Sequence, residues 1–279
     1  MPAILGIDAA WTVSNPSGIA LIQNLNGVWR CVQVCPDAKS FIEAAFGPQV
    51  WLTTYTMTAL VTQILAAADA LAHEPVTVVA LDLPLSRQPI RTRRVADDAT
   101  SQVCGRVGCP THSPSETRPG MLSEAYHDAL RHGGFSLCTN DVNEPPEKQA
   151  IEVYPHPAII ALLGAHFRLP YKVGKTNNYW PGVPLDGRWR LIIGVLGRIL
   201  TALQEQIVDI KLELPSPDRR GSFSCLKSFE DMLDALVCAW VGMQHMMQRT
   251  RALGDRDAAI WLPDYPQLFA NPNNQDQPE

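Results

Sequence analysis

The chain has 279 residues, with 23 Lys and Arg against 28 Asp and Glu, and its formal net charge of −5 excludes a uniformly basic nucleic-acid coat protein. Hydrophobic residues make up 46% and charged residues only 18%, so disorder is excluded for most of the chain and a large core is expected. No Gly/Ser-rich or charge-rich linker divides the sequence, which predicts one domain over residues 1–270 and a disordered polar tail over 271–279.

The N-terminal part of the chain predicts an antiparallel β-unit. Three short apolar runs of β type cover residues 3–7, 17–23 and 28–34. Asn26-Gly27 lies between the last two and is a strong hairpin signal, because both residues tolerate the positive φ of a type I′ turn. Residues 15–18, Asn-Pro-Ser-Gly, are expected to turn the first strand into the second.

The rest of the chain predicts helices alternating with buried strands. A helix over 56–73, with apolar residues at helical spacing, leads into a β-branched run over 76–83 that is typical of a strand buried on both faces. Residues 84–119 are expected to form a long irregular insertion. The remaining predicted elements are a helix over 119–132, a short buried strand over 151–154, and two helices over 189–205 and 228–247.

The cysteines and apolar segments indicate the compartment. Seven cysteines, an odd number in a chain long enough to fold without disulfides, are expected to be reduced thiols. The N-terminus shows no signal-peptide pattern, and no apolar stretch approaches the roughly 20 residues that cross a bilayer. We therefore expect a cytoplasmic protein that does not enter a membrane.

Acidic residues end or adjoin three predicted strands: Asp8, Asp82 and Glu152. A carboxylate in such apolar company is costly to desolvate unless it is paired or holds a cation. Taken singly, each could simply cap a turn after its strand. Asp8 and Asp82 together favour a site, because the predicted topology places both at one edge of a parallel sheet, where ligands bind in open α/β folds.

The last predicted helix adds Asp231 and Asp234, which are three residues apart and share a helix face. Ser228 and Asp231 also fit a capping box, so a structural role explains Asp231 as well as a metal role does. Asp234 lies inside the helix beside the small Ala235, a pattern that allows the helix to approach a sheet closely. Carboxylates gathered in this way suit Mg²⁺ or Mn²⁺, including two-metal phosphoryl chemistry with ions about 4 Å apart.

These motifs together resemble the domain of unknown function 429 family, whose members are predicted nucleases with an RNase H-like fold. The resemblance spans about residues 3–245 and is carried by Gly-Ile-Asp-Ala-Ala-Trp (6–11), Asn-Pro-Ser-Gly (15–18), Leu-Asp-Leu-Pro-Leu-Ser (81–86), Glu-Val-Tyr-Pro (152–155), Tyr-Lys (171–172) and Asp-x-x-Asp-Ala-Leu (231–236). It implies a five-stranded mixed sheet of order 3-2-1-4-5, flanked by helices and with an insertion after strand 4. It also implies that Asp8, Asp82 and Asp234 are metal ligands, with Asp231 or Glu152 as the fourth.

Two groups of cations are candidates for substrate binding. Arg91 and Arg94 follow the strand of Asp82, so they would lie above the same sheet edge, where Arg forks suit phosphate oxygens. A solvated surface loop with no role in binding explains the two arginines equally well. Lys172 and Lys175 lie near aromatic residues, as on single-strand binding surfaces, although aromatics are mostly core residues.

Two further features remain open. Cys104, Cys109 and His112 could supply three zinc ligands, but their spacing is looser than in common zinc ribbons and no second Cys pair lies nearby. His156, between two prolines, could orient a substrate, although an ordinary loop histidine is the simpler interpretation.

The favoured hypothesis is a Mg²⁺- or Mn²⁺-dependent nuclease, acting on nucleic acid or another phosphodiester, with Asp8, Asp82, Asp234 and Glu152 as catalytic residues. One alternative is an actin-like ATP-dependent phosphotransferase in which Thr12 and Ser14 face a γ-phosphate. Another is a non-catalytic binding protein with an RNase H fold, which the absence of a broad basic stripe favours. RNA, DNA, hybrid, junction and nucleotide substrates all remain open, as does the oligomeric state.

Overall fold

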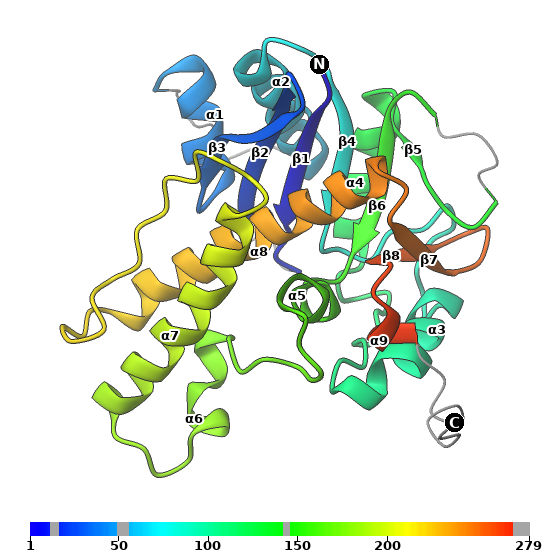
Figure 1. Ribbon diagram of the computed structural model, residues 1–279. Coiled ribbons are helices and arrows are strands. Elements are labelled where there is room, and N and C mark those ends of the chain that lie inside the picture. Colours follow the sequence, from blue (N-terminus) through cyan, green and yellow to red (C-terminus); the bar gives the residue numbers. More distant parts are fainter. Residues whose placement is uncertain (12–16, 49–55, 142–145, 270–279) are drawn as a thin grey trace, which may run out of the picture.

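The computed structural model describes residues 1–11, 17–48, 56–141 and 146–269, and it shows a mixed α/β fold with helices on both faces of one sheet (Figure 1). The strands are β1 (Ala3–Asp8), β2 (Gly18–Leu25), β3 (Val28–Cys35), β4 (Val76–Leu81), β5 (Ser136–Leu137), β6 (Gln149–Val153), β7 (Thr250–Gly254) and β8 (Ala259–Pro263). The α-helices are α1 (Ala38–Phe46), α2 (Met57–Ala72), α3 (Val95–Cys104), α4 (Met121–His132), α5 (Pro155–Leu163), α6 (Thr176–Tyr179), α7 (Leu185–Gln204), α8 (Phe223–Met246) and α9 (Pro266–Phe269). Two short 3₁₀ helices cover Gly105–Val107 and Val173–Lys175.

The β1–β2–β3 unit is antiparallel, as its apolar runs predict. Asn26 and Gly27 have φ angles of 54° and 87°, the left-handed conformations that a type I′ hairpin turn requires. The predicted turn between β1 and β2 includes residues 15 and 16, which lie outside the described residues.

The sheet is larger than predicted. Its order is β3-β2-β1-β4-β6-β8-β7, with β5 paired to β6, so the sheet has eight strands and the expectation of five is wrong. β4 is parallel to β1, β6 to β4 and β8 to β6. The additional strands escaped the sequence analysis because β5 has two residues and because β7 and β8, with five each, form no long apolar run.

The central strands are buried on both faces, because their side chains alternate between two cores. Ile4 of β1 packs in the core beneath α7 and α8, whereas Leu5 packs in the core beneath α1, α2 and α4. Figure 1 shows α8 crossing the sheet at β1 and β2, with α1 and α2 on the far side. Within the described residues, no helix has the length and apolar character needed to cross a bilayer.

Two helical expectations are corrected. α8 begins at Phe223, where the Ser222 hydroxyl accepts the Ser224 N–H at 3.1 Å, so Ser228 is inside the helix and the capping-box interpretation of Asp231 is wrong. The insertion over 84–119 is not irregular throughout, because it contains α3 and a 3₁₀ turn. The sequence analysis missed α3 because its apolar residues are few.

Candidate active site

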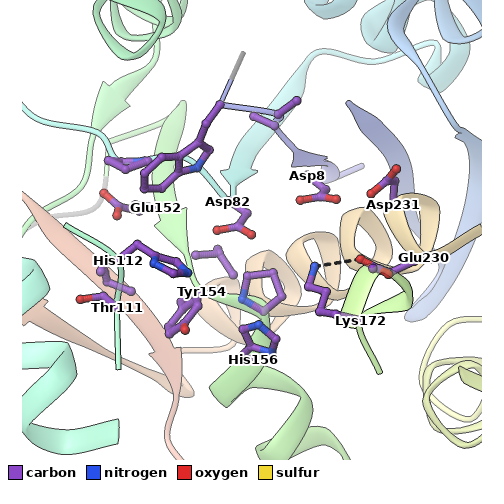
Figure 2. Close-up of a pocket in the computed structure, with 18 of the residues that line it drawn as sticks. Asp8, Asp82, Thr111, His112, Glu152, Tyr154, His156, Lys172, Glu230 and Asp231 are labelled. Carbon is purple, nitrogen blue, oxygen red and sulfur yellow. Dashed lines mark ion pairs between the residues drawn. The ribbon is translucent and has the colours of Figure 1, made fainter. Parts of the chain in front are cut away.

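Asp8 and Asp82 lie side by side at the carboxyl ends of two parallel strands. Ile7 of β1 pairs with Leu81 of β4, and the Asp82 N–H donates to the Ile7 carbonyl at 2.9 Å. Both carboxylates line a cavity of about 720 Å³ and face its interior in Figure 2. In the described part of the chain, neither side chain has a hydrogen bond or an ion pair, so both remain available to a ligand.

Helix α8 carries Asp231 and Asp234 to this strand end because glycines allow its backbone to lie directly on the sheet. A Cβ atom on Gly6 of β1 would lie 2.2 Å from the Ala235 carbonyl oxygen, and one on Gly18 of β2 would lie 2.1 Å from the Asp231 carbonyl oxygen. Only glycine permits such an approach. Asp234 is consequently fully buried (0% exposed), and its charge acts on Asp8.

Two lysines and a glutamate complete the acidic end of the cavity. The Lys172 ammonium lies 2.5 Å from Asp234 Oδ2 and 3.2 Å from Glu230 Oε1, while Lys227 pairs with Asp231 and Glu230. Glu230 is buried, and its Oε2 also accepts the Val173 N–H at 2.5 Å. The sequence analysis missed Glu230 and Lys227. The i, i+4 spacing of Glu230 and Asp234 was the available signal for Glu230.

We call five carboxylates the acidic cluster: Asp8, Asp82, Glu230, Asp231 and Asp234. Among the described residues, two ammonium groups, those of Lys172 and Lys227, pair with members of this set. Burial, followed by the negative charge of Asp234, raises the pKa of Asp8 well above its ordinary value. Burial, partly opposed by Lys172, raises the pKa of Asp82 to about 7. The acidic cluster is therefore short of positive charge and favours uptake of protons or a cation.

Glu152 and Arg94, predicted for catalysis and for phosphate binding, bind each other. Both Arg94 terminal nitrogens donate to the two Glu152 carboxylate oxygens at 2.7 Å, and Arg94 also binds Asp97 at 2.8 Å. The second Glu152 oxygen accepts the Leu85 N–H at 2.7 Å. This buried network ties α3 to β6 and holds the segment that follows Asp82.

Of the other two predicted cations, Lys175 lies at the cavity and Arg91 lies away from it. Lys175 is exposed and lines the cavity. Arg91 has a 76% exposed side chain, does not line the cavity, and approaches Glu116 at 3.8 Å. Thr12 and Ser14, on which the phosphotransferase alternative depends, are outside the described residues.

The expected zinc ligands separate into two environments. Cys104 and Cys109 are buried, which raises the pKa values of their thiols to about 12 and about 11, whereas His112 is exposed and lines the cavity. All seven cysteines of the chain are free. Across the described ranges, no three His, Cys, Asp or Glu side chains are grouped as a ready metal site.

His156 belongs to a helix and not to a loop. It lies in the first turn of α5, is 9% exposed, and lines the cavity. Its Nε2 lies 2.7 Å from a terminal nitrogen of Arg168, which can only donate, so Nε2 accepts. Burial, followed by the charges of Lys172 and Arg168, lowers the pKa of His156 well below its ordinary value, so the ring is neutral.

The comparisons with known proteins give one match. The model of the family described as "Protein of unknown function (DUF429)" matches residues 6–259. No curated protein and no solved structure matches the chain. The matched range contains every member of the acidic cluster, so the site lies within the part of the chain that defines the family.

Proposed function

The chain belongs to the DUF429 family, and from its acidic cluster we propose that it is a divalent-metal-dependent nuclease with an RNase H-like fold. The observation that carries the proposal is the position of Asp8 and Asp82 at adjacent parallel strand ends, without a side-chain partner among the described residues, with Asp234 brought beside them by α8. Ligands of open α/β sheets bind at this edge. The order β3-β2-β1-β4-β6 of the five strands counted from the β3 edge also supports the RNase H-like assignment.

The donor chemistry fits Mg²⁺ or Mn²⁺, which prefer oxygen ligands. Asp234 is buried, and among the described residues its ion pair with Lys172 uses Oδ2, so Oδ1 is left without an ion pair and can accept a cation. Asp8, Asp82 and Asp234 would hold the metal, with Asp231 as the fourth ligand, once their carboxylates close around the ion from the wider spacing that they have without it. A bound divalent ion supplies an activated water and stabilises charge on the leaving oxygen.

The protein's own groups orient these carboxylates. Lys172 fixes Asp234 and Glu230 through its two contacts, so they keep one arrangement despite their like charges. Arg94 and Glu152 act one strand further along, where they position the segment after Asp82. In this proposal Glu152 supports the ligands and does not bind the metal itself.

The test is calorimetric titration of Mn²⁺ into the wild-type protein and Asp8→Asn, followed by cleavage assays on single-stranded and duplex RNA and DNA. We expect one or two ions to bind the wild type, and both binding and cleavage to be lost in Asp8→Asn with an unchanged circular dichroism spectrum. Glu124→Gln, at an exposed position of α4, is the control and should behave as wild type. Full cleavage by Asp8→Asn would refute the proposal.

A non-catalytic binding role is the second candidate, because Lys172 already places a positive charge against Asp234. An acidic cluster neutralised in this way can persist without a metal. Failure of the wild-type protein to bind Mn²⁺ at millimolar concentration would favour this role over the nuclease.

A further inference from the structure

The cavity has a basic side as well as an acidic one. Arg118, Lys175 and His112 line it, and the charges of both cations act on His112. Arg168 lies behind this lining, where it binds His156. Figure 2 shows His112 and His156 across the cavity from Asp8 and Asp82. We call Arg118, Lys175, His112 and Arg168 the basic wall.

Among the described residues, no carboxylate forms an ion pair with a cation of the basic wall. In the described part of the chain, Arg118, Arg168 and Lys175 form no ion pair, although the protein as a whole carries an excess of acidic residues. Burial, followed by Lys175, Arg118 and Arg168, lowers the pKa of His112. Arg118, Lys175 and Arg168 carry like charges around His112, and an anion placed among them would relieve their mutual repulsion.

The size and lining of the cavity limit what the anion can be. A volume of about 720 Å³ is within the range of pockets that enclose small ligands. The Trp11 ring lines it, with the Arg118 guanidinium 5.8 Å from the ring centroid, and an aromatic face of this kind can stack with a base. A protein that grips long duplex needs a broad basic surface to contact many phosphates, and a pocket is not such a surface.

We propose that the cavity binds a single nucleotide unit bearing a phosphomonoester, with that phosphate on the basic wall. In a strand, the phosphodiester that joins this unit to the next nucleotide then lies toward the acidic cluster. The unit can be a free nucleotide or the phosphorylated end of a single strand. The binding claim stands on the basic wall alone, whereas cleavage rests on the proposed function. In a strand, hydrolysis of the phosphodiester that joins this unit to the next nucleotide adds water across one P–O bond, leaving a phosphate monoester on one product and a hydroxyl on the other.

Binding is tested by calorimetry in EDTA, where no cleavage occurs. The probes are a nucleoside 5′-monophosphate, a short single strand with a 5′-phosphate, a second with a 3′-phosphate, and the same strand without a terminal phosphate. We expect binding of at least one phosphorylated probe, weakened about tenfold or more when the phosphate is absent. Arg118→Met and Lys175→Met should each cause a similar loss. Asp8→Asn should bind the probe at least as tightly as the wild type.

Arg91→Met is the matched control, since Arg91 is an exposed arginine of the same insertion that does not line the cavity. Binding of the mononucleotide alone would identify free nucleotides as the source, and binding of a phosphorylated strand would identify strand ends. Equal binding of phosphorylated and unphosphorylated probes, or unchanged binding by both Arg118→Met and Lys175→Met, would overturn the inference.

Cleavage assays with Mn²⁺ separate this inference from the proposed function. Linear single strands should be cut from a phosphorylated end, and circular single strands should resist. Cleavage of circles at the same rate as linear strands would refute the terminal-unit inference while supporting the nuclease. Phosphate-dependent binding without any cleavage would support the inference and refute the nuclease.

Discussion

At the scale of single residues, the positive charge of Lys172 offsets the repulsion between carboxylates of the acidic cluster when no metal is bound. Burial acts to lower its pKa, but Asp234 and Glu230 outweigh burial and raise the pKa well above the ordinary value, so the ammonium stays charged. Removing one partner of a buried pair leaves the other charge uncompensated, which typically costs about 3 to 5 kcal/mol. Lys172 is therefore as important for stability as for any role toward a substrate.

We predict that Lys172→Met lowers the melting temperature in EDTA and that Mn²⁺ restores more stability to this variant than it adds to the wild type. The reason is that a bound ion would take over the compensation of Asp234 and Glu230. Differential scanning calorimetry with and without Mn²⁺ measures both effects. Lys211→Met, at an exposed position, controls for the loss of a lysine. A Mn²⁺ effect no larger than that of wild type would contradict the prediction.

At the scale of elements, the seating of α8 on β1 and β2 brings the carboxylates together. Gly6→Ala places a methyl group 2.2 Å from the Ala235 carbonyl oxygen, a backbone atom that can move only with the helix. We expect a loss of about 2 kcal/mol or more in the free energy of unfolding, measured with urea, and weaker Mn²⁺ binding because Asp234 moves with α8.

Gly194→Ala is the control for that experiment, because its new methyl group on α7 would meet no atom within 4 Å outside its own helix. It should raise the free energy of unfolding by up to about 1 kcal/mol, since alanine favours the helix. Similar losses in both variants would show that the contact between α8 and β1 is not tight.

Elements with a strong local pattern were predictable from the sequence. The expected helix over 56–73 corresponds to α2 (Met57–Ala72), and Asn26-Gly27 marked the β2–β3 hairpin. The short strands β5, β7 and β8 were missed, since strands of two to five residues carry too little hydrophobic periodicity. The start of α8 was misplaced because its Ser222 cap resembles any other serine, while Ser228 and Asp231 have the spacing of a capping box.

The residues of the candidate site also divide into those that a local sequence pattern predicts and those that it does not. Asp8 and Asp82 stand out locally, because an acidic residue that ends a buried apolar run is unusual. The pairing of Arg94 with Glu152 joins residues 58 positions apart. No local pattern reports such a contact, so each residue seemed free for chemistry when considered alone.

At the scale of the whole molecule, His245 joins the end of α8 to three strands. Its Nε2 lies 2.8 Å from Gln149 Oε1 of β6, and its Nδ1 lies 3.1 Å from Thr250 Oγ1 of β7. Its ring packs edge-on against Trp261 of β8, with the two ring centroids 4.3 Å apart. Burial lowers the pKa of His245 to about 4. Protonation of this one ring therefore weakens the contact between α8 and the strands β6, β8 and β7.

The sign of the pH effect follows from the two pKa values. An unfolded histidine has a pKa near 6.5, so between about pH 6.5 and pH 4 the unfolded chain binds more protons at His245 than the folded protein does. The stability that His245 contributes is present above pH 6.5 and is lost as the pH falls to 4, by roughly 2 to 3 kcal/mol. The acidic cluster has the opposite sign, since the raised pKa of Asp82, about 7, makes protonation favour the folded state as the pH falls below 7.

We predict that His245→Gln loses less stability than the wild type between pH 6.5 and pH 4, because glutamine does not titrate. Urea unfolding at pH 7, 6, 5 and 4 in EDTA measures this, and the difference between the two proteins cancels the common contribution of the acidic cluster. His132→Gln, with an exposed ring, should follow the wild-type curve. Parallel curves for wild type and His245→Gln would show that the folded protein accommodates the imidazolium, and that acid does not act through the contact of α8 with β6, β7 and β8.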